Sequence, residues 1–265
     1  NFLDSLEEDT TNRILKYHYE VARAYEYRLL RPYRKNINLI ATLEKMQSIV
    51  EANTETFLSA KEFDTLRAVY TSELSSIAEN ILFELSGENF PLQREKVLQF
   101  NQSELKALNN GKDIYLNLMA KDFFPDDMHD IRINSILVEN LDVDSEGSFG
   151  RSEEVSLEIA YSGKSYIKKG EDYYFFEKDI NSQKTKWGST FDLISGEQSE
   201  ILESPTASSL IYNLLGQNSE DKIMLLSRPG GLTQLKIRLR KDVSPDVQVS
   251  LHSAKIRIIY DYNTF

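Results

Sequence analysis

Cysteine is absent from this sequence, which excludes disulfide bonds, thiolate nucleophiles and cysteine-ligated zinc or iron–sulfur centres. Histidine is nearly absent too. His18, His129 and His252 lie in different segments, and none has a second histidine or a carboxylate at the helical spacing of a zinc site such as HExxH. Stability must therefore come from packing, and no pattern supports metal catalysis.

Long apolar runs and excess basic charge are also missing. No stretch of about 18 apolar residues occurs, so we predict no membrane span in this fragment, and no signal peptide is recognised. The 42 acidic side chains outnumber the 31 basic ones, and the formal net charge is −11. Because this field repels nucleic acid and anionic membranes, we expect no nucleic-acid partner.

Motifs of catalysis or nucleotide binding are broken or absent. Gly163-Lys164-Ser165 has the form of the end of a phosphate-binding loop, but Glu158 stands where that loop needs its first glycine. We interpret this stretch as a tight turn between Tyr161 and Tyr166. No G-x-S-x-G nucleophile elbow occurs. We therefore expect no enzyme, no catalytic residue and no cofactor-binding residue.

The first 110 residues show apolar positions at the helical period of three to four residues. Four segments follow this pattern, Glu8–Arg31, Ile37–Val50, Ser59–Leu85 and Phe90–Leu108, and the last would end at the polar break before Gly111. With 40% hydrophobic residues, the chain can bury a core. We expect an all-helical region over residues 1–110.

Beyond Gly111 the apolar period changes from about 3.6 to 2, which indicates β-strands. Seven to nine short strands fit, with no long helical pattern between them, so antiparallel pairing is favoured. The clearest alternating runs are Ile114–Leu118, Val155–Tyr161, Leu235–Leu239 and Val247–Leu251. The predicted fold is α+β, with the N-terminal helical segment followed by an antiparallel β-sandwich over residues 111–265.

An acidic stretch resembles a calcium-binding loop. Asp142, Asp144, Glu146 and Glu153 occupy positions 1, 3, 5 and 12, and Gly147 stands at the sixth position, where the sharp turn falls. Strand patterns flank this stretch on both sides, whereas the calcium loop needs helices. The context favours an acidic hairpin loop, and calcium bound by these four carboxylates is the alternative hypothesis.

Aromatic residues suggest contact surfaces. Tyr17 and Tyr25 lie on a helical stripe with arginines nearby, which suits a partner-binding surface as well as it suits internal packing. Trp187 and the run Tyr173–Phe176 could form a sugar- or protein-binding face on a sheet. Alternation would turn about half of such residues into the core, so burial competes with binding.

The junction of the two regions resembles the C-terminal region of the A subunit of bacterial insecticidal toxin complexes. The similar segment runs from Leu105 to Val138: a helix ends at a polar-glycine break, an alternating strand follows, and Phe124-Pro125 precedes the strand that opens at Arg132. The family's later Asn-Phe-Arg-Asp stretch and Pro-Phe-Glu-Gly turn are absent here. The resemblance implies a β-sandwich that docks another component of a large secreted assembly.

Three functions remain open on the sequence, and the one that ranks last is an enzyme with dispersed carboxylates. The first is a non-enzymatic docking module of a larger secreted, bacterial toxin-like or injection-type protein that binds a partner protein. The start at Asn1 rather than methionine agrees with a piece of a longer protein. The second is a lectin-like or adhesin module that binds a ligand, with calcium at Asp142 as an optional cofactor.

Overall fold

The computed structural model describes residues 91–120, 123–147, 149–150, 153–177, 185–203 and 228–264, together with residues 25–32 and scattered positions before residue 84. The chain forms two compact units. One comprises Asn1–Asn89 with Ala207–Ser227, and the other comprises Phe90–Thr206 with Arg228–Phe265. The second unit contains the strands and the site described below.

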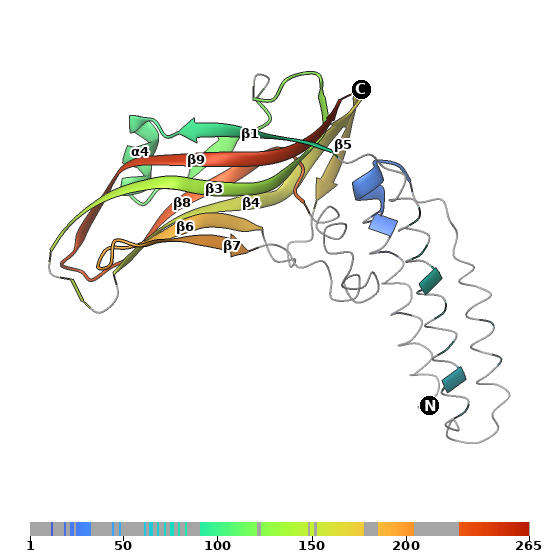
Figure 1. The fold of residues 1–265 in the computed structure, drawn as a ribbon, viewed down its shortest axis with the longest axis horizontal. Coiled ribbons are helices and arrows are strands. Elements are labelled where there is room, and N and C mark those ends of the chain that lie inside the picture. The colour runs from blue at the N-terminus through green and yellow to red at the C-terminus, as the bar shows by residue number, and fades with distance from the viewer. Residues whose placement is uncertain are drawn as a thin grey trace. The chain divides into compact units, whose positions relative to one another are not determined.

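Two antiparallel sheets make up the second unit (Figure 1). The smaller sheet has the order β1-β9-β3, and the larger one has the order β2-β8-β4-β6-β7, with β5 paired to the end of β4. Strand β3 contacts both β4 and β6, so the sheets form two packed layers. The elements are β1 (Leu92–Gln99), α4 (Gln102–Asn109), β2 (Ile114–Asn117), β3 (Met128–Glu146), β4 (Glu154–Lys169), β5 (Asp172–Glu177), β6 (Lys186–Asp192), β7 (Gln198–Glu203), β8 (Leu232–Asp242) and β9 (Gln248–Thr264).

The core lies between the sheets and is built from the alternating apolar residues. On β4, Val155, Leu157 and Ile159 are fully buried, while the residues between them face outward. Trp187 on β6 lies opposite Ile159 and is 2% exposed, so its large ring fills the space between the layers. Side chains alternate across a strand, which is why a period of two produces one apolar face.

The prediction of an all-helical segment up to residue 110 followed by a β-sandwich is wrong. Strand β1 lies inside that segment and pairs with β9 over its whole length, from Leu92 opposite Tyr262 to Gln99 opposite Lys255. The described residues are mostly antiparallel strand. The helix α4 is short, with Asn101 as its N-cap and Glu104 completing a capping box.

Strand β1 was predicted as part of a helix because it is a mostly exposed edge strand. Its sequence, LQREKVLQ, lacks an alternating apolar face. Lys96 occupies a half-buried position where an alternating strand would carry an apolar residue. The methylene groups of its side chain can cover apolar surface there, and its ammonium lies 4.1 Å from the centroid of the Phe123 ring. Pairing with β9 therefore decides the conformation of these residues, as is common where strand propensity is weak.

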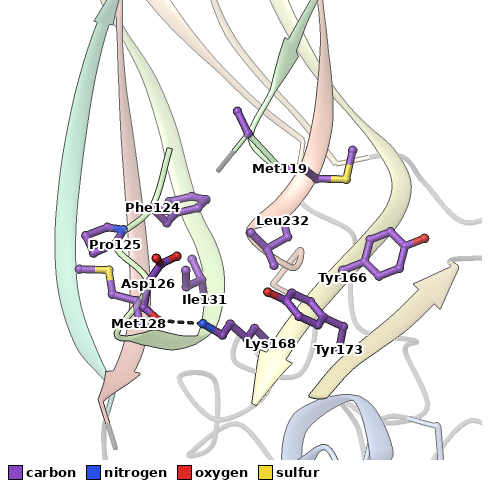
Figure 2. A pocket seen from close by; sticks show the side chains of 11 residues that line it. Met119, Phe124, Pro125, Asp126, Met128, Ile131, Tyr166, Lys168, Tyr173 and Leu232 are labelled. Atoms are coloured by element: carbon purple, nitrogen blue, oxygen red, sulfur yellow. Dashed lines mark hydrogen bonds between the residues drawn. The ribbon is translucent and has the colours of Figure 1, made fainter. Parts of the chain in front are cut away.

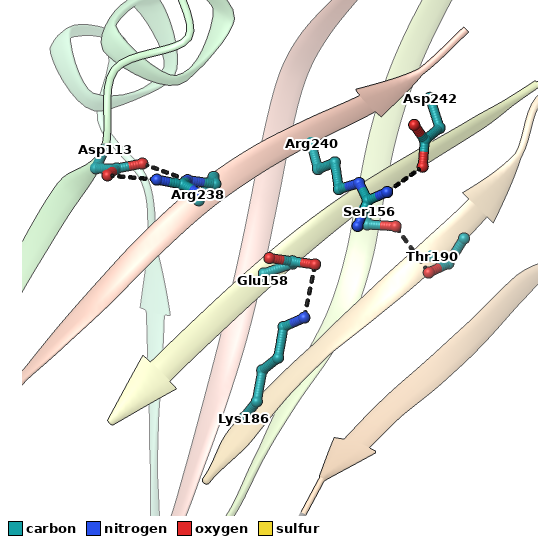
Figure 3. A network of polar contacts seen from close by, with 8 residues as sticks. All are labelled: Asp113, Ser156, Glu158, Lys186, Thr190, Arg238, Arg240 and Asp242. Atoms are coloured by element: carbon teal, nitrogen blue, oxygen red, sulfur yellow. Dashed lines mark hydrogen bonds and ion pairs between the residues drawn. The ribbon is translucent and has the colours of Figure 1, made fainter. Parts of the chain in front are cut away.

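The outer face of the larger sheet carries polar and charged pairs rather than an apolar surface, some between neighbouring strands and one, Arg240 with Asp242, within β8 (Figure 3). Arg238 donates to both carboxylate oxygens of Asp113, at 2.8 and 3.1 Å, and Lys236 lies 2.6 Å from the same carboxylate. Basic and acidic side chains thus neutralise one another on this face. The other pairs are Lys186 with Glu158, Arg240 with Asp242 and Ser156 with Thr190.

Truncating the side chain of Ile159 should destabilise the second unit while keeping Trp187, whose fluorescence reports unfolding. Ile159→Ala leaves a cavity beside Trp187, and we expect it to cost about 2–5 kcal/mol of unfolding free energy. Urea unfolding followed by the fluorescence of Trp187, the single tryptophan, measures this change. The exposed Gln234→Ala should shift the free energy by less than about 0.5 kcal/mol, and equal effects of the two variants would contradict the proposed packing.

Candidate functional site

A cleft of about 380 Å³ opens in the second unit between the connection from β2 to β3 and the hairpin of β4 and β5 (Figure 2). Most of its lining is apolar or aromatic. The lining residues are Met119, Ala120, Phe124, Pro125, Asp126, Met128, Ile131, Tyr166, Lys168, Tyr173 and Leu232. These side chains come from segments far apart in the sequence, so only the fold assembles them.

The wall formed by the connection from β2 to β3 is held by buried aromatic packing. The ring of Phe124 is 6% exposed and meets the rings of Phe123 and Tyr260 edge to face, at centroid distances of 4.8 and 4.9 Å. Such contacts fix ring orientation. Met119, in contrast, remains 45% exposed at the edge of the cleft.

The opposite wall is the β4–β5 hairpin. Gly170, with φ of +63°, and Glu171 form its two-residue turn, so Lys169 lies opposite Asp172. Tyr166 lies opposite Phe175, with ring centroids 5.1 Å apart, and Tyr173 lies opposite Lys168. Tyr173 is 61% exposed and Phe175 50%. These rings form an aromatic face that continues from the cleft along the hairpin.

The tight turn predicted between Tyr161 and Tyr166 is wrong. Strand β4 continues through this stretch, but its pairing with β8 shifts register between Tyr161 and Ser165, and Gly163 has φ of +83°. The hydroxyl of Thr233 donates to the carbonyl of Lys164 at 2.6 Å inside the irregularity. A bulge of this kind bends a strand, and the part of β4 beyond it carries the aromatic face.

Two hydrogen bonds tie the hairpin to the other wall. The ammonium of Lys168 donates to the carbonyl of Asp126 at 2.7 Å, and the backbone N–H of Gly170 donates to Nδ1 of His129 at 3.1 Å. Nδ1 can accept only when it carries no proton. Burial, and next the charge of Lys168, lower the pKa of His129 against an opposing effect of Asp127, which favours the accepting form.

The cleft offers an ammonium beside aromatic and aliphatic surfaces. Among the described residues no carboxylate pairs with Lys168. One of its three ammonium protons is donated to the carbonyl of Asp126, and the others can be donated to an oxygen of a bound molecule. Apolar walls with few polar groups are typical of binding sites. Within the described part of the chain, no three His, Asp or Glu side chains are placed to hold a metal ion.

The four residues of the calcium hypothesis are divided between two environments. Asp142, Asp144 and Glu146 alternate along the exposed side of β3, and Asp144 lies 2.9 Å from Nε2 of His252. Glu153 is fully buried. Its carboxylate accepts from the backbone N–H of Gly150 at 2.8 Å, from that of Ser244 at 2.6 Å and from the Ser244 hydroxyl.

Glu153 therefore links the connection between β3 and β4 to the connection between β8 and β9. Gly147, the expected turn glycine of the calcium hypothesis, serves the same junction. It has φ of +136°, and a Cβ there would collide with the carbonyl oxygen of Asp246. Close approach of two backbones accounts for the glycine at this position.

The residues predicted to bind a partner also separate. Tyr17 lies outside the described residues. Tyr25, in the first unit, belongs to a helical stretch, is 8% exposed and has the Arg31 guanidinium 5.8 Å from its ring centroid. Trp187 is enclosed in the core and presents no surface to a partner. The neighbouring aromatic run behaves differently, because Tyr173 and Phe175 are exposed while Tyr174 and Phe176 are half-buried.

Met119, Tyr166 and Lys168, which also line the cleft, were not predicted as functional residues. A signal for two of them exists, since Gly170-Glu171 separates two alternating stretches and predicts that Tyr166 and Lys168 share a face with Phe175 and Tyr173. Nothing in the sequence places Met119 beside them.

No protein-family model matches this chain, and no curated protein shows significant similarity to it. Among the described residues, no helix has both the length and the apolar character needed to cross a membrane.

The contact between His129 and Gly170 should weaken in acid. Because the pKa of His129 in the folded chain is below its ordinary value of 6.5, the opened state takes up a proton first, and the contact loses stability as the pH falls below about 6.5. The protection factor of the Gly170 amide, which is its intrinsic exchange rate at a given pH divided by the observed rate, should therefore fall from pH 7 to pH 5. His129→Asn keeps an acceptor that does not titrate. An equal loss of Gly170 protection with falling pH in the wild-type chain and in His129→Asn would refute this prediction.

Glu153→Gln should destabilise the second unit at neutral pH, because the amide cannot accept all the bonds from Ser244 and Gly150. Bonds from Ser244, first from its hydroxyl, and from Gly150 lower the pKa of Glu153 below its ordinary value of 4.5. The stability contributed by the carboxylate is therefore present above about pH 4.5 and is lost as the pH falls through the folded value. Thermal unfolding of the wild-type chain and of Glu153→Gln should give midpoint temperatures that differ at pH 7 and differ less in acid. A difference in midpoint that does not change with pH would argue against this role of the carboxylate.

Proposed function

We propose that this chain is a docking module whose cleft and aromatic face bind an extended segment of a partner protein. The carrying observation is the group of exposed large side chains around one cleft: Tyr166, Tyr173, Phe175 and Met119. Tyrosine, phenylalanine and methionine are enriched at protein interfaces. Clustered exposure of such residues marks an interaction site more strongly than scattered exposure does.

The dimensions and polarity of the cleft suit a peptide segment. A volume of about 380 Å³ is at the small end of ligand sites and accommodates an anchoring side chain. The aromatic face beyond the cleft offers contact area for the residues that follow the anchor. Lys168 lies where it can donate to a backbone carbonyl or a carboxylate of the segment. The proposed role is recognition without catalysis.

One wall of the cleft coincides with the segment that resembles the toxin-complex A subunit. Met119, Phe124, Pro125, Asp126, Met128 and Ile131 all fall between Leu105 and Val138. This coincidence supports a proposal that the partner is a component of a larger secreted assembly. The buried packing of Phe124 gives this wall a defined shape, as docking to a specific partner requires.

Sugar binding is the second candidate. Tyr173 and Phe175 expose rings on the same side of one strand, and flat aromatic surfaces suit the apolar faces of sugar rings. The polar lining is sparse for a sugar, since among the described residues that line the cleft only Asp126, Lys168 and the two tyrosines carry polar side-chain groups. Protein docking is therefore the better-supported function.

Selection of random peptides displayed on phage against the full chain tests the proposal. Synthetic copies of the selected peptides should bind, and Tyr173→Ala should weaken their affinity about tenfold or more, because truncating a central aromatic contact typically costs over 1 kcal/mol.

Tyr115→Ala is the matched control, since Tyr115 is 59% exposed on β2 but does not line the cleft. It should change the affinity less than about twofold. Failure to select any peptide, or equal effects of both variants, would overturn protein docking at this site. Robust binding on a glycan array that depends on Tyr173 would favour the second candidate instead.

A further inference from the structure

The tip of the β4–β5 hairpin is carried by a part of β4 that extends beyond its pairing with β8. That pairing ends at Tyr166, opposite Leu232, whereas the pairing with β5 continues to Lys169. Among the described strands, only β5 pairs with the last three residues of β4. The bonds between the tip and the opposite wall of the cleft therefore help to set the position of the tip.

His129 supplies the one of these two bonds that can respond to mild acid. It is the second residue of β3, and its Nδ1 accepts from the backbone N–H of Gly170 at 3.1 Å. The other bond runs from the ammonium of Lys168 to the carbonyl of Asp126, and a backbone carbonyl takes up no proton in mild acid. Imidazole has an ordinary pKa of about 6.5 and does titrate in this range.

Protonation of His129 turns its bond to the tip into a repulsive contact. Nδ1 then carries a hydrogen of its own, so two N–H groups point at each other with their nitrogens 3.1 Å apart. The imidazolium also adds a positive charge near the ammonium of Lys168. Gly170 lies between Lys169 and Glu171, whose charges are opposite in sign. Acid thus removes an attraction between the two walls and adds a repulsion.

The charged groups around His129 come from several elements. Lys168 approaches from β4, and Asp127 lies in the connection before β3. On β9 the residue opposite His129 is Asn263, which carries no charge. The adjacent Asp130 is bonded to Asn263 and to a buried arginine. Burial, and next the charge of Lys168, disfavour the imidazolium and lower the pKa of His129, while Asp127 acts in the opposite sense.

An anchoring side chain in the cleft needs both walls. The lining side chains labelled in Figure 2 belong to one wall or the other, and the bond from Lys168 to the carbonyl of Asp126 crosses between them. Phe124 and Met128 lie on one side, and Tyr166 and Tyr173 on the other. A side chain bound between them contacts both walls at once, and a gap of less than one ångström already forfeits much of that attraction.

We infer that protonation of His129 frees the hairpin from the opposite wall and weakens docking, so that the partner segment binds near neutral pH and is released in mild acid. This inference rests on the proposed docking function and adds its regulation. His129 acts as a positioning residue. Because binding needs the contact that only unprotonated His129 makes, proton uptake and binding oppose each other.

The affinity of a phage-selected peptide at pH 7.5 and at pH 5 tests the inference. The peptide should contain no histidine and be amidated at its C-terminus, which limits its own titration. By isothermal titration calorimetry, the wild-type chain should bind it about threefold or more weakly at pH 5, because protonation of one group competes with binding. His129→Asn keeps an acceptor that does not titrate, and its affinity should be nearly equal at the two pH values.

His252→Asn is the matched control. His252 carries another imidazole, but it lies 2.9 Å from Asp144, near the end of β3 opposite to His129, and does not line the cleft. This variant should retain the pH dependence of the wild-type chain. His129→Arg has a permanent charge and no acceptor, so it should bind weakly at both pH values. Unchanged Trp187 fluorescence verifies that each variant is folded.

Proton release gives a second measurement that does not depend on comparing affinities. At pH 6, binding of the peptide to the wild-type chain should release protons, at most one per complex, because part of the free chain is protonated at His129 and the complex is not. The measured heat should therefore vary with the ionisation enthalpy of the buffer. In His129→Asn this dependence should disappear.

Three outcomes would overturn the inference and leave docking intact, as long as Tyr173→Ala still weakens binding. They are an affinity of the wild-type chain that does not fall in acid, an equal fall in the wild-type chain and in His129→Asn, and proton release that persists in His129→Asn. If no peptide is selected, or if peptides bind independently of Tyr173, docking at this site fails and its regulation fails with it.

Discussion

Closure of two apolar sheet faces on each other is the constraint on which the rest of the second unit depends. Each face exists because apolar residues alternate along the strands, and each is stable only when the other covers it. Trp187 and Ile159 lie opposite each other on neighbouring strands and are buried in this contact. Strand order, the buried wall at Phe124 and the junction at Glu153 all follow from bringing these faces together.

The cleft lies where this closure gives way to an open hairpin. Beyond the bulge at Gly163, β4 pairs mainly with β5, which leaves one side of the hairpin with exposed aromatic rings. Lys168 and Gly170 bond to the opposite wall and set the width of the cleft. A rigid core thus supports an accessible aromatic surface, an arrangement that suits recognition because little ordering is needed on binding.

Several elements were predictable because their signals are local. Only the end of the predicted helix Phe90–Leu108 is helical, in α4, which ends at Asn109 before the predicted break at Gly111. The run Val155–Tyr161 is the buried face of β4. The failures involve pairing between distant segments. Strand β1 has no alternating face of its own, the bulge at Gly163 resembles a turn, and the buried Glu153 resembles a ligand of calcium until its bonds to Ser244 are seen.

The sequence by itself determined that cysteine and long apolar runs are absent, that the chain is acidic, and that strands with one apolar face follow Gly111. These properties depend on composition and on periods of two residues, which neighbouring positions encode. Only the tertiary structure decided that β1 joins β9, that Trp187 is enclosed, and that Met119 lines the same cleft as Tyr166 and Tyr173. Each of these contacts joins residues far apart in the chain, and their energy appears only when both partners are in place.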